Sequence, residues 1–291
     1  MIYFKRLLTS LNNQELNTFI KLLILFLSFY VIVISINNFI MSDLHTYCIS
    51  HKNHKFLNSL NINIIGTGNY FKNPGHYPEN WFKDDMGENI SFKNKNFGTL
   101  TSHFWFWKNM LHKHKKNDWI AFCHYRRFWV KKKVDPMISI KDLKKDLLKE
   151  VIDKDNNYEA FLPEKVLVNK VKLTKLIKKG YNNYLRNPSI LFNNNKNNIE
   201  LHFDMFHGYK YLSKATEVMS TVDRYDFKEY GKSGSFHPHQ IFITKPGILE
   251  ILYQKTFEWI FECEKVFKDY KLDGYGKERL YDFLAERFFS F

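Results

Sequence analysis

Cysteine is scarce in this sequence, and its placement suits neither metal binding nor disulfide pairing. The 291 residues contain three cysteines, Cys48, Cys123 and Cys263, which are far apart and belong to no Cys-x-x-Cys pattern. A zinc ribbon and a disulfide framework are therefore excluded as the basis of the fold. Cys48 and Cys123 lie in apolar runs, which predicts small buried side chains and a reducing compartment.

The sequence also lacks the short motifs of several enzyme classes. It contains no phosphate-loop motif, no G-x-S-x-G and no H-E-x-x-H, and GTGN at 66–69 is too short for a dinucleotide fingerprint. A D-x-D spacing occurs at Asp153 and Asp155, and many sugar-nucleotide enzymes hold a divalent metal with this spacing. Here it precedes a predicted strand instead of ending one, so we interpret it as a solvated turn.

Charge is absent from residues 22–42. The run LLILFLSFYVIVISI at 22–36, with its flanks, approaches the roughly 20 apolar residues that a spanning helix requires. We therefore predict that the N-terminal segment, 1–42, contains an apolar helix that anchors the chain in a membrane at about 19–41. The alternative is a start codon assigned too early, with Met41 opening the domain directly.

Positive charge is in excess, with 44 Lys and Arg against 30 Asp and Glu and a formal net charge of +14. This excess favours an anionic partner, such as nucleic acid, anionic lipid or a phosphorylated small molecule. The alternative is a coding bias, because Lys, Asn, Ile, Phe and Tyr are all abundant. The basic residues are scattered and no recognition motif is present, so we do not predict nucleic-acid binding.

Residues 43–291 are predicted to form one α/β domain, because short strands alternate with helices and no linker divides them. Strands are predicted at 43–50, 62–65, 119–123, 158–162 and 240–244, helices at 99–115, 139–151, 173–185, 199–222, 246–268 and 277–289, and a long loop at 69–98.

The stretch WIAFCHYRRFWV at 119–130 changes from apolar to charged within a few residues. Ligands of open α/β sheets bind beyond the carboxyl ends of the strands, and arginine binds phosphate oxygens bidentately. If the strand continued, His124 and Arg126 would share one face, and Tyr125 and Arg127 the other. We therefore predict that Arg126 contacts a phosphate. The alternative is a pair of salt-bridged arginines at the rim of the sheet.

A second polar group, DDMGENISFKN at 84–94, precedes the aromatic helix FWFWKN at 104–109. Its carboxylates are Asp84, Asp85 and Glu88, and its neutral groups suited to sugar hydroxyls or bases are Asn89, Ser91 and Asn94. Trp105 falls off the main apolar face and is predicted to stack on a sugar or base, whereas Trp107 is predicted to lie in the core. The alternative for the polar group is an ordinary capped turn.

These segments occur in a recognisable order. DDMGENISFKNKNFGTLTSHFWFWKN, a strand ending in HYRRFW, then FLPEK, HPHQIFITKPGILEILYQKTFEWIFECEKV and FLAERFF resemble the DUF4422 family over about residues 44–291. HYRR and G-[DE]-N-I-S are the most specific marks. The resemblance implies a glycosyltransferase-like protein of capsule, O-antigen or exopolysaccharide synthesis with the nucleotide-sugar-binding GT-A fold.

The family pattern matches many residues of this chain and departs from it at two. The matching positions are Asp84, Gly87, Asn89, Ile90, Ser91, Asn94, Leu100, Thr101, Trp105, Trp107, Lys108, Asn109, His124, Tyr125, Arg126, Arg127, Glu286 and Arg287. Met86 stands where the family usually has Thr, and Thr99 where it usually has Glu. If that Glu is catalytic in the family, this protein is inactive or uses another carboxylate.

Together these features predict a GT-A-like mixed sheet flanked by helices, in an enzyme that transfers a hexose-like sugar from a nucleotide-sugar donor to a glycan or lipid-linked acceptor. The predicted catalytic residues are Asp84, Glu88, His124 and Glu286, and the predicted donor-binding residues are Asn89, Ser91, Asn94, Trp105, Lys108, Tyr125, Arg126 and Arg127. The domain is expected on the cytoplasmic side of a membrane.

No metal ligand and no required cofactor are predicted. His124 to Arg126 fill the strand end where GT-A enzymes commonly carry D-x-D, so we expect fixed cations to stabilise the departing diphosphate. Bound manganese or magnesium is the alternative to this arrangement. A second class of function is a non-catalytic, membrane-associated protein that binds glycans or sugar nucleotides.

Overall fold

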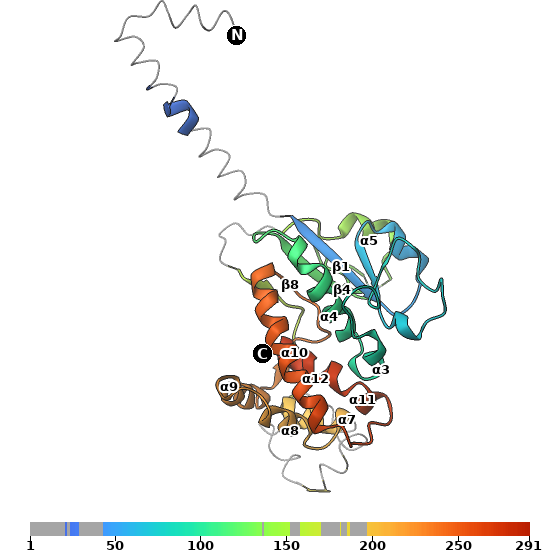
Figure 1. The fold of residues 1–291 in the computed structure, drawn as a ribbon, viewed down its shortest axis with the longest axis vertical. Coiled ribbons are helices and arrows are strands. Elements are labelled where there is room, and N and C mark those ends of the chain that lie inside the picture. Colours follow the sequence, from blue (N-terminus) through green and yellow to red (C-terminus); the bar gives the residue numbers. More distant parts are fainter. Residues whose placement is uncertain are drawn as a thin grey trace, which may run out of the picture. The chain divides into compact units, whose positions relative to one another are not determined.

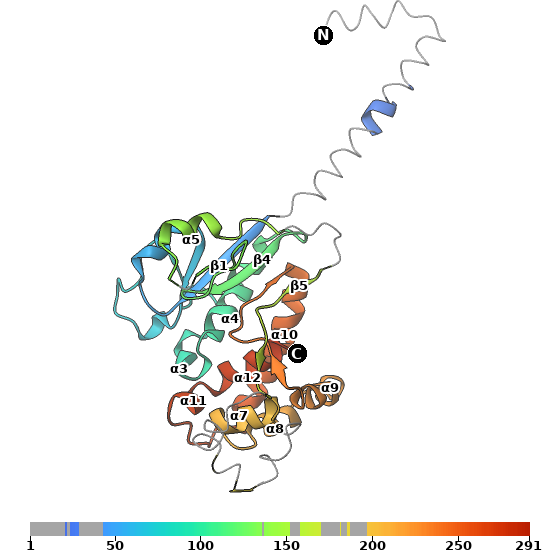
Figure 2. The same cartoon turned by 180° about the vertical axis from the view of Figure 1, so that it is seen from behind.

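A six-stranded mixed sheet is the centre of the domain at residues 44–291 (Figures 1 and 2). The structure is a computed structural model that describes residues 21, 24–28, 43–135, 137–151, 158–169, 181, 185–186 and 197–291. The strands lie in the order β3 (Phe82–Lys83), β2 (Asn63–Gly66), β1 (Leu44–Ser50), β4 (Trp119–His124), β8 (Ile243–Thr244) and β5 (Ala160–Phe161). The first four in this order are parallel, and β8 runs antiparallel to β4 and β5.

β1 and β4 form the middle of the sheet. β4 is an apolar run whose first five residues are buried, as expected for a parallel strand covered on both faces. The two strands pair in register from Leu44 opposite Trp119 to Ile49 opposite His124. Cys48 and Cys123 lie opposite each other in this register, and both are buried free thiols, which confirms their predicted burial.

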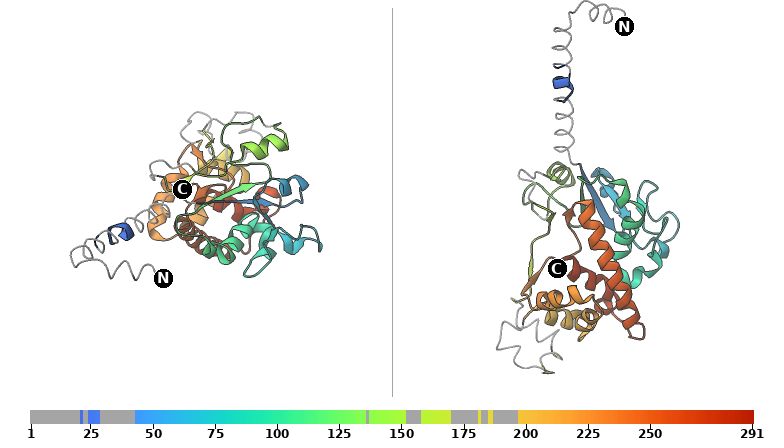
Figure 3. Two further views of the ribbon diagram at one scale, coloured as in Figure 1. Left: turned by 90° about the horizontal axis from the view of Figure 1, so that it is seen from above. Right: turned by 60° about the vertical axis from the view of Figure 1, so that its left-hand side comes forward.

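Helices cover both faces of the sheet. They are α4 (Leu100–Asn109), α10 (Pro246–Val266) and α12 (Leu280–Phe289) on one face, and α5 (Ile140–Asp146) on the other. The first face has the larger core, where Tyr47 and Phe122 pack among the aromatic side chains of these helices. On the second face Leu143 packs with Cys48 and Cys123. Figure 3 shows α10, in orange, running alongside the sheet.

The remaining elements lie around this core. The helices α7 (Ile199–His207), α8 (Tyr211–Glu217) and α9 (Thr221–Gly231) pack against one another, and α8 packs against α10. A two-stranded ladder joins β6 (Val166–Leu167) to β7 (Ser235–Phe236). The short helical turns are η1 (Lys55–Ser59), η2 (Asn69–Phe71), η3 (Ser91–Lys93), α3 (Asn94–Phe97), η4 (Leu111–Lys113) and α11 (Tyr275–Glu278).

The predicted mixed sheet with flanking helices is confirmed, but some elements differ from the prediction. The predicted helix at 199–222 is interrupted, because α7 ends at Gly208, whose φ of 128° favours glycine. The predicted loop at 69–98 contains β3 and α3, which are too short to show a periodic pattern. The predicted helix at 173–185 lies largely outside the described residues.

The predicted single-pass anchor at about 19–41 is not supported. Within this span the structure describes residue 21 and residues 24–28, which are helical, and the rest lies outside the described residues. Among the residues described, no helix has both the length and the apolar character needed to cross a membrane. The apolar N-terminal helix and the membrane-associated location that we predicted from it are therefore withdrawn.

Candidate functional site

The order of the parallel strands reverses between β1 and β4, which makes this a topological switch point of the sheet. In the order β3-β2-β1-β4, the chain proceeds outward from β1 on one side and returns to add β4 on the other. Ligands of open α/β sheets bind outside the carboxyl ends of the strands at such a switch point. His51 directly follows β1, and His124 is the last residue of β4. The fold therefore brings these two histidines to the expected ligand position.

The chain turns back sharply at the end of β4. The backbone N–H of His124 donates to the Arg127 carbonyl at 3.1 Å, and the N–H of Arg127 donates to the His124 carbonyl at 2.8 Å. Tyr125 and Arg126 are the two residues of this turn. The strand does not continue through HYRR, so the condition under which His124 and Arg126 would share one face is not met.

Arg126 and Arg127 are both exposed, and neither pairs with a carboxylate among the described residues. Arg126 lies 4.9 Å from the centre of the neighbouring Tyr125 ring. The alternative of two salt-bridged arginines at the sheet rim is therefore not what the described part of the chain contains. Two guanidinium groups are left available to an anion.

The Tyr125 side chain packs this turn against the loop that follows β1. Its ring stacks on His54 with a centroid separation of 4.8 Å and meets His51 edge-on at 5.0 Å. The loop that follows β1 is thereby tied to the turn that follows β4. Tyr125 thus contributes packing that holds the two ends of the switch point together.

The two histidines at the switch point are held neutral. Burial above all, together with the charges of His239, Arg127, His51 and Arg126, lowers the pKa of His124 to about 3. Its Nε2 atom is buried and has no hydrogen-bond partner among the described residues. A neutral imidazole with an unused ring nitrogen is available to bond a ligand, but it is not a proton donor at neutral pH.

Positive charge gathers around His51 as well. Burial lowers the pKa of His51 to about 4, and Arg279, Lys52 and Lys72 act in the same direction, followed by Arg126. These side chains come from the loops after β1 and β2, from the turn after β4 and from the start of α12. Their convergence gives the carboxyl edge of the sheet a cationic character that suits a phosphorylated ligand.

Opposite the arginines, α12 places two carboxylates one helical turn apart. Glu286 accepts a 2.6 Å hydrogen bond from the His239 backbone N–H and pairs with Arg287. Its side chain is 12% exposed. His239 and Gln240 have φ angles of 78° and 52°, an uncommon conformation for residues with a β-carbon. The Glu286 bond helps to hold this segment.

Asp282 is more deeply buried than Glu286. Its Oδ1 atom accepts hydrogen bonds from Thr99 Oγ1 and Gln240 Nε2, each at 3.0 Å. Burial raises the pKa of Asp282 to about 6, against the opposing charge of Arg279. Thr99 stands where the family resemblance implies a Glu, and Asp282 places a carboxylate next to that position.

Asp84 is a buried brace. It is 0% exposed, and its carboxylate accepts hydrogen bonds from the backbone N–H groups of Gly68 and Asn69 at 2.7 and 2.9 Å. It also accepts from Ser91 Oγ at 2.7 Å and Thr101 Oγ1 at 2.5 Å. Asp84 therefore joins the loop after β2, the start of η3 and the first turn of α4.

The other polar residues of this segment are also satisfied within the protein. The Asn89 amide donates to the Gly87 and Asp85 carbonyls at 2.8 and 3.0 Å and closes the turn. The Asn94 amide donates to the Gly98 carbonyl at 2.6 Å and to Thr101 Oγ1 at 2.9 Å. The alternative of a capped turn describes this segment well.

Four further predicted residues lie away from the switch point. Glu88 is exposed on the loop before η3, where its backbone pairs with Asn109. Trp105 is 3% exposed against Phe82, so it offers no surface for stacking a sugar, whereas Trp107 is half-buried. Lys108 lies 3.6 Å above the Trp107 ring and lines a pocket at the amino edge of β4.

Three residues at the carboxyl edge were not predicted from the sequence: His51, His239 and Asp282. His51 carries the same signal as His124, since each ends a buried strand. Asp282 lies four residues before Glu286 on a predicted helix, hence on the same face. His239 precedes an antiparallel strand, so its approach to the edge depends on the pairing of β8 with β4.

A metal site is not assembled at this edge from the described residues. The group of three possible ligands that they form is His45, His114 and Asp118, at the opposite, amino edge. Asp153 and Asp155 of the D-x-D spacing lie outside the described residues. Around the switch point the described charges are mainly cationic, which suits direct binding of an anion.

Comparison with known proteins agrees with the fold. The chain is similar to the apo structure of WbbM, a bifunctional glycosyltransferase, with a TM-score of 0.61 and 22% identity over 86% of this chain and 42% of that one. The likeness concerns the fold, and this chain spans less than half of the WbbM chain.

No match was found among curated proteins. A family profile described as a domain of unknown function, DUF4422, matches residues 45–291. The resemblance seen in the sequence is therefore confirmed, and the chain belongs to the DUF4422 family.

Proposed function

We propose that this protein is a glycosyltransferase that moves a sugar from a nucleotide-sugar donor to a glycan or lipid-linked acceptor in surface polysaccharide synthesis. The observation that carries the proposal is the pair of arginines, Arg126 and Arg127, exposed at the switch point with no carboxylate partner among the described residues. The similarity of the fold to a glycosyltransferase supports the same reading.

Arg126 and Arg127 are assigned to the donor diphosphate. Guanidinium groups keep their charge at any working pH and bind phosphate oxygens bidentately. Because a preceding buried strand and the Tyr125 packing hold the turn, the charges are positioned before the ligand arrives. The unused Nε2 atom of His124 is assigned to a further hydrogen bond to the donor.

The proposed step exchanges one bond at the anomeric carbon. The bond between that carbon and the diphosphate oxygen breaks, and its electron pair leaves with the nucleoside diphosphate, whose charge the arginines stabilise. A bond forms to the acceptor hydroxyl oxygen, and the hydroxyl proton passes to a carboxylate. We assign that role to Asp282, because a base is most effective when its pKa lies near the working pH.

Glu286 and Asp84 are assigned positioning roles. Glu286 holds the His239 backbone, which lines the same edge. Asp84 has no exposed surface, and its carboxylate is already occupied by protein donors. Glu88, Asn89, Ser91 and Asn94 lie in or beside that braced segment and are assigned to shaping the loop after β2, in place of direct donor contacts.

Donor binding by the full-length chain tests the proposal. A panel of UDP-, GDP- and CMP-sugars is titrated by calorimetry, and at least one is expected to bind and to release its nucleotide slowly. Arg126→Ala is expected to weaken that binding roughly 10- to 100-fold, because it removes charge-assisted hydrogen bonds. Lys115→Ala removes the same charge from an exposed residue at the opposite edge and serves as the control.

Two results contradict the proposal. Equal affinity in the Arg126→Ala and Lys115→Ala variants removes the assigned phosphate contact. If activity disappears with EDTA and returns with manganese, a bound metal ion stabilises the diphosphate in place of the fixed arginines.

A non-catalytic protein that binds glycans or sugar nucleotides is the second candidate, and it is favoured by Thr99 at the position where the family resemblance implies a Glu. Donor binding without any nucleotide release, with every acceptor offered, supports this second candidate.

A further inference from the structure

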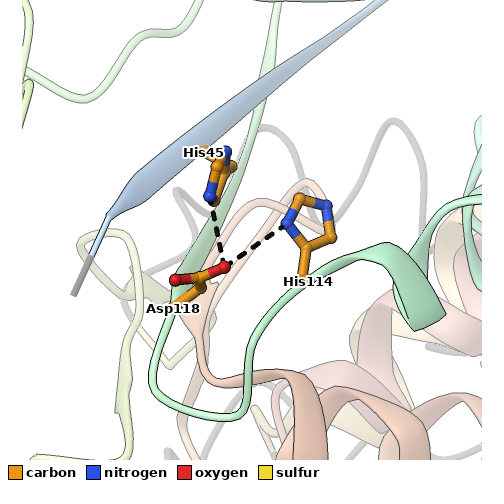
Figure 4. Close-up of side chains that lie close together, drawn as sticks. All are labelled: His45, His114 and Asp118. Atoms are coloured by element: carbon orange, nitrogen blue, oxygen red, sulfur yellow. Dashed lines mark ion pairs between the residues drawn. The ribbon is translucent and has the colours of Figure 1, made fainter. Parts of the chain in front are cut away.

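We propose that His45, His114 and Asp118 bind one divalent transition-metal ion, zinc in particular, at the amino edge of the sheet (Figure 4). The Nε2 atom of His45 lies 3.3 Å from Asp118 Oδ2, and the Nδ1 atom of His114 lies 3.9 Å from the same oxygen. The three ligand atoms all lie within 4.8 Å of one another. Tetrahedral zinc holds neighbouring ligand atoms about 3.3 Å apart, so small side-chain rotations close the set around one ion.

The three residues stand on ordered parts of the fold. His45 is the second residue of β1 and pairs in register with Ile120 of β4. His114 ends η4, and Asp118 directly precedes β4. The backbone N–H of Lys115 donates to Asp118 Oδ2 at 2.9 Å, which fixes this carboxylate toward the histidines. Two segments distant in sequence, the start of β1 and the loop between η4 and β4, therefore present their ligand atoms to one point.

A second contact orients the His114 ring. The hydroxyl of Tyr47 lies 3.0 Å from His114 Nε2, and Tyr47 is 3% exposed. When a histidine binds a metal through one ring nitrogen, the other usually donates a hydrogen bond to a nearby group, which fixes the ring and its tautomer. The Tyr47 hydroxyl occupies that position, and when His114 Nε2 donates to it, Nδ1 is unprotonated and faces Asp118.

Access and chemistry suit a zinc ion. His45 lines a pocket of about 620 Å³, and His114 lines another of about 550 Å³. The His45 side chain is 34% exposed, so an ion can enter from solvent. Two imidazole nitrogens and one carboxylate oxygen form a common zinc ligand set that leaves a fourth position for water or another ligand.

This site is separate from the proposed donor site. β1 has seven residues, with His45 near its start and His51 just beyond its end, so the two edges lie about 20 Å apart. An ion at His45 cannot touch a diphosphate held at Arg126. The zinc proposal therefore does not depend on the proposed function.

Metal binding to the tag-free, EDTA-treated full-length chain tests the proposal. Calorimetry with Zn²⁺ is expected to give one site per chain, and Co²⁺ is expected to give the visible absorption of a tetrahedral complex. His45→Ala removes a ligand that is partly exposed, and it is expected to weaken zinc binding at least about tenfold. Tyr47→Phe is expected to weaken binding roughly 10- to 100-fold while keeping one site per chain.

His112→Ala is the matched control, because it removes an exposed histidine of η4 that does not belong to the group. Unchanged zinc binding in this variant, together with loss in His45→Ala, supports the site. The proposal is overturned if the wild-type chain binds no zinc. It is also overturned if wild type and His45→Ala bind equally, since the ion is then adventitious and held by other histidines. Asp118→Asn, which keeps a side-chain oxygen for Lys115, checks the result with a second ligand.

Discussion

Asp84 lies inside the protein, whereas Arg126 lies at the surface. The Asp84 carboxylate is surrounded by backbone and hydroxyl donors, which replace the water that it loses on burial. Arg126 has no carboxylate partner among the described residues, so it keeps its charge for a ligand. The same motif-bearing sequence therefore supplies one residue for structure and another for recognition.

Replacing Asp84 with Ala is expected to lower the free energy of unfolding by about 3 kcal/mol or more. The change leaves buried donors at Gly68, Asn69, Ser91 and Thr101 without their acceptor. Urea unfolding of the full-length chain, followed by circular dichroism, measures the loss. Asp85→Ala is the control, because Asp85 is only half-buried and accepts one side-chain bond, from Asn69. A similar small loss in both variants rules out the bracing role.

At the scale of elements, α12 carries the carboxylates Asp282 and Glu286, and the turn after β4 carries the exposed arginines. Helical spacing puts Asp282 and Glu286 on one face, and the Thr99 and Gln240 bonds hold Asp282 against the start of α4 and the segment before β8. The tight turn at His124 to Arg127 holds the arginines at the end of β4. Under the proposed function, these two elements, far apart in sequence, supply the base and the groups that bind the donor diphosphate.

The rate of sugar transfer is expected to rise with pH through about 6 and then to level off. The base must be ionised to accept a proton, and burial raises the pKa of Asp282 to about 6, so its ionised fraction grows over that range. Asp282→Asn is expected to remove this limb of the pH profile and to lower kcat roughly 10²- to 10⁴-fold. Steady-state kinetics across pH measures both effects.

Asp269→Asn, at an exposed carboxylate that follows α10, is the control for this change of charge. If Asp282→Asn keeps the wild-type kcat while Glu286→Gln loses it, the base is Glu286, and the assignment of Asp282 is wrong.

At the scale of the whole molecule, the sheet separates two sites at opposite edges. The arginines and carboxylates converge at the carboxyl edge of β1 and β4, and the His45 group lies at their amino edge. Because the strands between them are buried and regular, neither site contacts the other.

The two sites are therefore expected to bind their ligands independently. Saturating zinc is expected to change the donor dissociation constant by less than about twofold, and Arg126→Ala is expected to leave zinc affinity unchanged within the same factor. Calorimetry of each ligand in the presence and absence of the other measures this coupling. A tenfold change in either affinity contradicts the separation and corresponds to about 1.4 kcal/mol of coupling between the edges.

The local pattern of residues was sufficient for some of this architecture. Residues 119–123 are uniformly apolar, and only a strand covered on both faces satisfies such a run in a sheet of this class. The helix that begins at Pro246 was equally plain, because proline favours the first helical turn and the apolar periodicity continues for five turns or more. These signals depend on neighbours in sequence alone.

The roles of Trp105 and Trp107 show where such patterns fail. The sequence placed Trp107 in the core and Trp105 at the surface, but the structure buries Trp105 against Phe82, while Trp107 is partly buried, packs against the core and donates to Glu250. In a helix as aromatic as α4, both faces are apolar, and the neighbouring elements decide which is covered.

By itself, the sequence determined the α/β class, the buried strand at 119–123 and the place where its apolar run stops, because composition and periodicity are local properties. Only the tertiary structure decided that the chain turns back at His124, that Asp84 is enclosed, that His51 and His239 lie near the arginines, and that Asp282 lies beside Thr99. It also brought His45 to His114 and Asp118. Strand pairing and helix packing bring together the residues of each contact, which are far apart in the sequence. Such long-range contacts do not produce a periodic pattern in the local sequence, so the sequence alone does not predict them.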